Sequence, residues 1–174
     1  MKALARPLWN QRGVSRRTKL RVYNSTILSI LLYGAETWPL TKTLSARIDG
    51  FDGRALRRIE GIFWPRIISN EDLRAITHQP PASRLAAMRR VRWYGHLLRL
   101  PDDHPTKALL DFDPAREGWL RPRGAPRTRW LDVVAQDLQL CDLTLAAARP
   151  LAQNRPAWRR LVARVGSTLP EHED

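Results

Sequence analysis

Residues 88–100, MRRVRWYGHLLRL, are the stretch from which the fold prediction starts. At about 100° per residue, a helix through this stretch places four basic side chains within an arc of about 80°. These side chains are Arg89, Arg92, His96 and Arg99. Most of the remaining circumference is apolar or aromatic, including Trp93, Tyr94 and Leu97. The pattern therefore predicts a helix that is largely buried and carries one narrow basic ridge.

This basic ridge favours contact with a phosphate backbone. The solvent face of a helix usually mixes charges of both signs, whereas no Asp or Glu occurs between Arg84 and Leu100. A row of Arg without acids suits an element that follows phosphates. The alternative is an ordinary solvent face built from Arg. His96 alone is better explained by hydrogen bonding or packing than by catalysis, because no partner for an acid–base site accompanies it.

Helical spacing of apolar residues recurs along the chain, and the alternation typical of strands is scarce. The expected helices cover residues 15–33, 44–60, 71–77, 83–100, 128–140 and 157–165. The expected caps are Ser15, Thr41 or Thr43, Asn70 and Asn154, and the expected stops are Gly34 and Gly61. Pro150 is expected to break the weak helix before the last one. Residues 27–33, ILSILLY, are apolar almost all round and are expected to be buried.

Composition narrows the class of protein. The chain has 174 residues, of which 43% are hydrophobic, so it can bury a core and is not a disordered basic tail. It carries 30 Lys and Arg against 17 Asp and Glu, a net charge of +13. No uninterrupted stretch of apolar residues is long enough to span a membrane, and the N-terminus lacks the apolar stretch of a secretory signal. We therefore expect an intracellular protein without a membrane partner. Its high positive charge predicts that it binds nucleic acid, and the alternative is that it binds an acidic protein.

Two further basic clusters accompany the ridge. The first lies in the opening turns of the expected first helix and comprises Arg16, Arg17, Lys19 and Arg21. Cations there oppose the helix dipole unless a bound phosphate reverses the effect. The second lies in and just after a Pro/Gly-rich loop, residues 113–127, and comprises Arg121, Arg123, Arg127 and Arg129. The alternatives are a solvated helix face for the first cluster and a flexible linker for the second.

The C-terminal quarter has a different balance. Residues 131–174 hold five cations and six acids, so we expect them to serve folding or partner contacts more than phosphate binding. Cys141 lies on an apolar stripe, which is typical of a packed thiol. Asp102 and Asp103 fit a helix stop better than a metal site, because Pro101 precedes them and no strand surrounds them. We expect no catalytic residue, no metal and no cofactor.

Five strings carry a resemblance to a known family. They are LWN at 8–10, RTKLRVYNSTILSILLYGAETWPLTKT at 17–43, GRALRRIEGIFW at 53–64, RRVRWYGHLLRLPDD at 89–103 and RPRGAPRTRWLDVV at 121–134. Together they resemble the C-terminal region, thumb and post-thumb, of the reverse transcriptase of non-LTR retrotransposons. These are LINE-like elements of the jockey/RTE type that encode an endonuclease–reverse transcriptase polyprotein. The resemblance covers about residues 8–165.

The resemblance implies a mostly α fold with a thumb-like helical bundle. A second small helical region would follow, joined by the Pro/Gly/Arg-rich loop. The implied segments are thumb-like helices at 1–66, a basic helical connector at 67–112, and the Arg-rich loop with the C-terminal helices at 113–174. The implied partners are RNA and DNA as a template–primer backbone, together with the palm and fingers of the polymerase. The implied location is the nucleus or a cytoplasmic ribonucleoprotein.

The sequence also departs from the family. The catalytic aspartates of such polymerases belong to a palm motif upstream of these strings, and the sequence LPDDHP is not that motif. Residues 124–127 read GAPR where the family has a Gly-Arg-Pro-Arg type string, and Pro150 interrupts what resembles a continuous helix. We therefore expect a non-catalytic fragment of an RNA-directed DNA polymerase that binds RNA and DNA. The alternative is a domesticated or decayed fragment that acts as a helical protein-interaction module.

Overall fold

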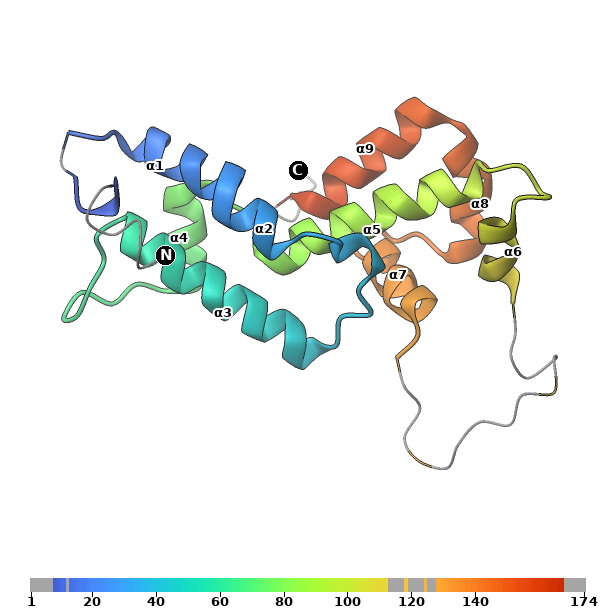
Figure 1. Ribbon diagram of the computed structural model, residues 1–174, viewed down its shortest axis with the longest axis horizontal. Coiled ribbons are helices and arrows are strands. Elements are labelled where there is room, and N and C mark those ends of the chain that lie inside the picture. Colours follow the sequence, from blue (N-terminus) through green and yellow to red (C-terminus); the bar gives the residue numbers. More distant parts are fainter. Residues whose placement is uncertain (1–7, 12, 113–117, 119–123, 125–127, 168–174) are drawn as a thin grey trace. The chain divides into compact units, whose positions relative to one another are not determined.

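The computed structural model describes residues 8–11, 13–112, 118, 124 and 128–167. Every regular element among these residues is a helix, which confirms the prediction of a mostly α fold (Figure 1). The chain divides into two compact units. Unit 1 takes the described residues within Met1–Ala35, Lys42–Ala86 and Gly166–Asp174, and unit 2 those within Glu36–Thr41 and Ala87–Val165. The three segments implied by the family resemblance (1–66, 67–112 and 113–174) are defined by sequence motifs, whereas the two units are defined by packing. That division therefore stays a prediction.

Unit 1 opens with one continuous helical stretch in three parts. They are α1 (Arg16–Val22), the π-helical η3 (Tyr23–Leu28) and α2 (Ser29–Leu31). The Ser15 side chain accepts a hydrogen bond from the Thr18 amide at 3.2 Å, so the predicted cap is confirmed. Gly34 follows with a φ of +69°, a conformation that glycine adopts at little cost and that suits a helix stop. The π-helical turn was not predicted.

The stretch ILSILLY is only partly buried, so the expectation for it was wrong. Leu28 and Leu32 are buried, whereas Ile30 and Tyr33 are 76% and 84% exposed. A helix that packs on one side leaves its other side to solvent, whatever residues that side carries.

Two more helices complete the framework of unit 1. The second helix is α3 (Lys42–Ile59), followed by Gly61 with φ +65°, as predicted. The next is α4 (Asn70–Thr77), and its cap is Ser69, whose side chain accepts from the Asp72 amide at 3.0 Å. The prediction of Asn70 as the cap was wrong by one residue. Asn70 instead accepts a hydrogen bond from Arg57 at 2.9 Å, which ties α4 to α3.

The next helix, α5 (Ala82–Leu98), begins in unit 1 and continues into unit 2. Asp49 on α3 accepts hydrogen bonds from the Ser83 amide at 2.8 Å and from the Ser83 hydroxyl at 2.6 Å. Its carboxylate thereby caps the first turn of α5, where backbone amides have no partner inside the helix. The start of this helix, expected at residue 83, is confirmed to within one residue.

The described part of unit 2 contains four further α-helices, besides the short 3-10 helix η4 (Ala35–Thr37) at its start. They are α6 (Pro105–Asp111), α7 (Trp130–Gln139), α8 (Leu145–Gln153) and α9 (Arg155–Gly166). Helix α6 was not predicted, although Pro105 at its start is a common helix-opening residue. The expected break at Pro150 was wrong, because α8 runs through it with Ala148 and Ala152 buried on one face. Asn154 caps α9 as predicted, accepting from the Ala157 amide at 3.1 Å.

The core of unit 2 draws on all the helices around α5. Its fully buried members include Val91 from α5, Val134 and Leu138 from α7, and Val165 from α9. Cys141 lies in this core and is 8% exposed, in agreement with a packed thiol. Among the residues that the structure describes, no helix is both long and apolar enough to cross a membrane.

Candidate nucleic-acid interface

The predicted ridge on α5 lies opposite the buried side of that helix. Val91 and Tyr94 are buried in the core of unit 2, while Arg92 and His96 are exposed. Arg99 follows directly after the helix and is half-buried. The helical periodicity of residues 88–100 therefore placed Arg92 and His96 at the surface correctly, whereas Trp93, expected on the buried side, is 38% exposed.

Helix α9 faces this ridge across a groove of about 730 Å³, which we call the basic groove. The α5 side contributes Met88, Arg92, His96, Arg99 and Leu100, and the α9 side contributes Arg155, Trp158, Arg159, Val162 and Ala163. Four of these residues are Arg, one is His, and none is acidic. Arginine side chains on both walls, with no carboxylate among the lining residues, give the groove a positive charge that would attract an anion.

A glycine allows the two walls to approach. A Cβ atom at Gly95 would lie 2.0 Å from Nε1 of Trp158, well inside contact distance. Trp158 is 3% exposed and packs with Tyr94, their ring centroids 6.4 Å apart. Gly95 therefore leaves room for the indole that holds α9 against α5.

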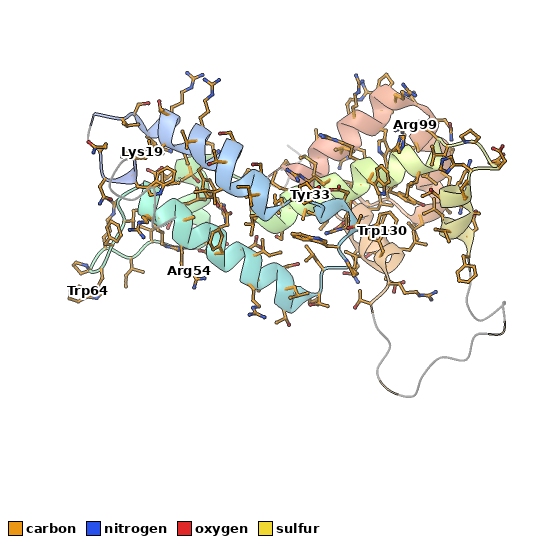
Figure 2. The ribbon with its side chains drawn as sticks, in the orientation of Figure 1. Lys19, Tyr33, Arg54, Trp64, Arg99 and Trp130 are labelled. Atoms are coloured by element: carbon orange, nitrogen blue, oxygen red, sulfur yellow. The ribbon has the colours of Figure 1, made fainter. Side chains whose placement is uncertain are left out.

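Hydrogen bonds fix the end of the groove near Arg99, labelled in Figure 2. Nη1 of Arg99 donates to the carbonyl oxygen of Ala152 at 2.9 Å, and Nε2 of Gln153 donates to the carbonyl oxygen of Leu98 at 3.3 Å. Burial lowers the pKa of the Arg99 guanidinium, and the nearby charge of Arg155 lowers it further. The groove thus holds like charges close together, a cost that a bound anion would offset.

Another arginine of α5 has a structural role instead. Arg90 is 3% exposed and donates from Nε and Nη2 to the two carboxylate oxygens of Asp137 on α7, at 2.7 and 3.0 Å. A buried charge needs such a partner, and the bidentate geometry suits Arg and a carboxylate. This ion pair was not predicted. The one feature of the sequence that hints at it is that Arg90 lies away from the basic ridge of the helix.

Arg155 and Arg159 were also missed, because the charge of residues 131–174 was judged as a whole. Helix α9 itself, RPAWRRLVARVG, contains four Arg and no acid. The acids of that quarter lie elsewhere, at Asp132, Asp137, Asp142 and in the last four residues. The expectation that this quarter serves folding more than phosphate binding overlooked the composition of α9. The i, i+4 spacing of these two Arg would have placed them on one helix face.

The first basic cluster lies on unit 1 and is partly engaged in the fold. Arg16 forms an ion pair with Glu60 at 2.9 Å, and Lys19 donates to the carbonyl oxygen of Trp9 at 2.8 Å. Arg16, Arg17 and Arg21 line a second, wider groove of about 1170 Å³ together with residues at the end of α4. Two of the four predicted cations therefore hold the structure together as well as offering charge.

The remaining predicted residues are less informative. Arg121, Arg123 and Arg127 lie outside the described residues. Arg129 precedes α7, and its amide donates to Asp132 at 2.9 Å. Arg89 is half-buried and does not line the basic groove. The groove thus brings together Arg92, His96 and Arg99 of the predicted ridge with Arg155 and Arg159 of α9.

The acids at the end of α5 make an exposed turn. Asp102 is fully exposed and accepts from Nζ of Lys107 at 2.6 Å, a bond that lowers the pKa of its carboxyl. Within the described part of the chain, no group of three or more His, Cys, Asp or Glu is placed to hold a metal ion. The arginines of the basic groove offer positive charge and hydrogen-bond donors, which suit the binding of an anion.

Comparison with known proteins gives one informative similarity. The chain is 25% identical over 156 residues to a protein of Caenorhabditis elegans described as transposon-derived and uncharacterized. The match covers 86% of this chain, which spans about half the length (55%) of that relative. No protein-family profile matches the chain, and no solved structure matches it. The similarity points to a transposon-related origin.

Proposed function

We propose that this chain is a fragment of a retrotransposon RNA-directed DNA polymerase that binds the phosphate backbone of RNA and DNA. The fragment would correspond to the thumb and post-thumb region of the polymerase, which holds a template–primer without catalysing its extension. The observation that carries the proposal is the basic groove, in which two helices present Arg side chains and no acid. The similarity to a transposon-derived protein supports the origin.

The construction of the groove suits a phosphate backbone. Arg92 and His96 come from one wall and Arg155 and Arg159 from the other, so a strand lying between them meets donors on both sides. Guanidinium groups donate paired hydrogen bonds to phosphate oxygens and keep their charge at any working pH. Such contacts carry no sequence information, so we expect binding that tolerates any sequence.

The experiment measures binding of a labelled RNA–DNA duplex by fluorescence anisotropy. The test variant is Arg155→Gln with Arg159→Gln, which removes two charges from the groove. The matched control is Arg47→Gln with Arg54→Gln, which removes two charges from exposed positions of α3 on unit 1 (Arg54 is labelled in Figure 2). Thermal unfolding of each variant verifies that it is folded.

At about 0.1 M salt each lost phosphate contact weakens binding by close to tenfold. We therefore expect the test variant to lose about 50- to 100-fold in affinity and the control less than threefold. An equal loss in both variants would show that only the net charge matters, and would overturn the role of the groove. No binding by the unaltered chain would overturn the function. A primer-extension assay is expected to show no nucleotide incorporation.

The exposed apolar side chains of unit 1 favour a second candidate, a protein-interaction module. Ile30, Tyr33, Trp64 and Ile67 are each more than three-quarters exposed. Large exposed apolar groups are typical of surfaces that bind other proteins. This candidate predicts a saturable protein partner whose binding persists at high salt, whereas nucleic-acid binding fades with salt.

A further inference from the structure

We infer that α5 carries a composite site for single-stranded nucleic acid, with phosphates in the basic groove and an unpaired base stacked against Trp93. The inference rests on the proposed function and narrows its ligand. It concerns unit 2 alone, because all the residues involved lie in that unit.

Trp93 and His96 connect two different surfaces of α5. Their ring centroids are 5.1 Å apart and the rings are tilted by 31°, so the pair forms a short aromatic platform. His96 lines the basic groove, whereas Trp93 lines a separate pocket. Trp93 is 38% exposed, which leaves part of its indole open to a ligand.

That separate pocket has a volume of about 590 Å³, and we call it the apolar pocket. Apolar and aromatic side chains form much of its lining, among them Trp93, Leu97, Leu109, Phe112 and Trp130. Leu109 is 68% exposed and Phe112 43% exposed, so the pocket is open to solvent. It is large enough for a nucleobase, whose flat face suits an aromatic lining.

The position of Trp130 shows that the aromatic lining is held in place. Its Nε1 donates to the carbonyl oxygen of Glu36 at 2.7 Å, which orients the indole at the start of α7 (Figure 2). Its ring also lies edge-on to Tyr94, with centroids 6.2 Å apart. A preorganised wall costs a ligand less ordering on binding.

The neighbouring charges select the kind of ligand. An apolar peptide would fill the pocket but gain nothing from the positive charge of Arg92 or the polar ring of His96 near Trp93. A nucleotide strand uses both surfaces, since its phosphates meet the basic groove while a base reaches the apolar pocket. Arg129 and Asp132, which also line that pocket, form an ion pair at 4.0 Å and together add no net charge. Charge complementarity therefore favours a polyanion with exposed flat rings.

The site distinguishes single strands from duplexes. Bases in a duplex are paired and stacked on one another, so only the phosphates are accessible to the groove. An unpaired base can turn out of its strand and stack on an aromatic side chain, which strengthens binding by roughly tenfold to a hundredfold per base. The composite site is thus expected to favour unpaired template or primer over blunt duplex.

The test compares Trp93→Ala with Trp93→Phe, and uses Trp64→Ala as the matched control. Trp64 belongs to unit 1, is 86% exposed and lines neither the basic groove nor the apolar pocket. It is labelled in Figure 2. The probes are a pyrimidine oligonucleotide of about 12 nucleotides and a blunt RNA–DNA duplex of the same length. Thermal unfolding of each variant verifies the fold.

We expect Trp93→Ala to weaken binding of the single strand by about tenfold or more and binding of the duplex by less than twofold. Trp93→Phe is expected to keep most of the affinity, and Trp64→Ala all of it. Binding of the single strand should also quench the part of the tryptophan fluorescence that Trp93→Phe removes, a readout that does not depend on the Ala variant folding. If Trp93→Ala weakens both probes equally or neither, or if this quenching is absent, the inference is wrong.

These outcomes separate the inference from the proposed function. If the unaltered chain binds both probes and the Arg155→Gln, Arg159→Gln variant weakens both, the groove binds phosphates whatever Trp93 does. If the unaltered chain binds neither probe, the proposed function fails and the inference fails with it.

Discussion

Nε1 of Trp158 lies directly over the backbone of Gly95, where a Cβ atom would come within 2.0 Å of it. This contact joins α9 to α5 at the base of the basic groove, because Trp158 also lines the groove. Glycine inside a helix costs about 1 kcal/mol relative to Ala. The close packing of an indole explains why glycine stands here.

The contact predicts an unusual effect for Gly95→Ala. In an open helix this change stabilises by about 0.5–1 kcal/mol. Here we expect it to lower the free energy of unfolding by about 1–3 kcal/mol, because the added methyl group overpacks the site. The matched control is Gly50→Ala on α3, where a Cβ would meet nothing within 4 Å. Urea unfolding of both variants measures the difference, and equal effects would contradict the packing described.

A double-mutant cycle isolates this contact further. Trp158→Ala removes the obstructing indole and is expected to cost about 3–5 kcal/mol, as for other buried aromatic residues. In that background Gly95→Ala should no longer destabilise, so the two changes are expected to be strongly non-additive. Additive effects in urea unfolding would show that the two residues are not coupled.

The buried ion pair of Arg90 and Asp137 predicts a second asymmetry. Arg90→Met removes the bidentate ion pair of Asp137, which is 6% exposed, and is expected to cost about 3–5 kcal/mol. Changing both residues to apolar ones also removes the buried carboxylate and should recover most of the loss. The exposed pair of Arg149 and Asp111 serves as the control, with Arg149→Met costing less than about 1 kcal/mol. Thermal unfolding tests the order of these effects, and an equal cost for both arginines would contradict it.

A third prediction concerns alkaline pH. The Tyr23 hydroxyl donates to Asp52 at 2.5 Å, and Arg74 pairs with the same carboxylate at 2.6 Å. Burial first, and then the charge of Asp52, raise the pKa of Tyr23 above its usual value. Tyrosine in an unfolded chain loses its proton near pH 10, before the folded one does. This contribution to stability is therefore fully present below about pH 10 and is lost as the pH rises further.

Tyr23→Phe tests this directly. For each tyrosine whose pKa is raised by folding, the free energy of unfolding falls by up to about 1.4 kcal/mol per pH unit above pH 10. We expect the variant to be less stable at neutral pH, because the partner of Asp52 is lost, but to lose less on alkalinisation. Tyr94, whose pKa burial also raises, continues to titrate in both proteins. The urea midpoints of the unaltered protein and of Tyr23→Phe should converge as the pH rises. Midpoints that fall in parallel would contradict the prediction.

Much of the fold could be predicted because local signals agree with the tertiary structure. Ser15 and Gly34 bound the first helical stretch, and the apolar residues of the last two turns of α3 and of one side of α5 are buried. The failures have physical causes. Pro150 reads as a helix breaker by local preference, but packing around Ala148 and Ala152 overrides that preference.

The groove was predicted only on one side. The periodicity of residues 88–100 placed Arg92 and His96 at the surface, but which helix faces them depends on tertiary packing. Arg155 and Arg159 come from a helix more than fifty residues away, and a segment's net charge does not reveal a local basic face. The role of Gly95 was equally hidden, because its reason is a side chain on another helix.

The salt dependence of binding tests the central claim most directly, namely that the basic groove holds phosphates. For about four to six phosphate contacts, a plot of log K against log salt should fall with a slope of about −3.5 to −5.5. Arg155→Gln with Arg159→Gln should flatten that slope by about 1.8, and Arg47→Gln with Arg54→Gln should leave it unchanged. A slope near zero, or the same flattening in both variants, would contradict the account.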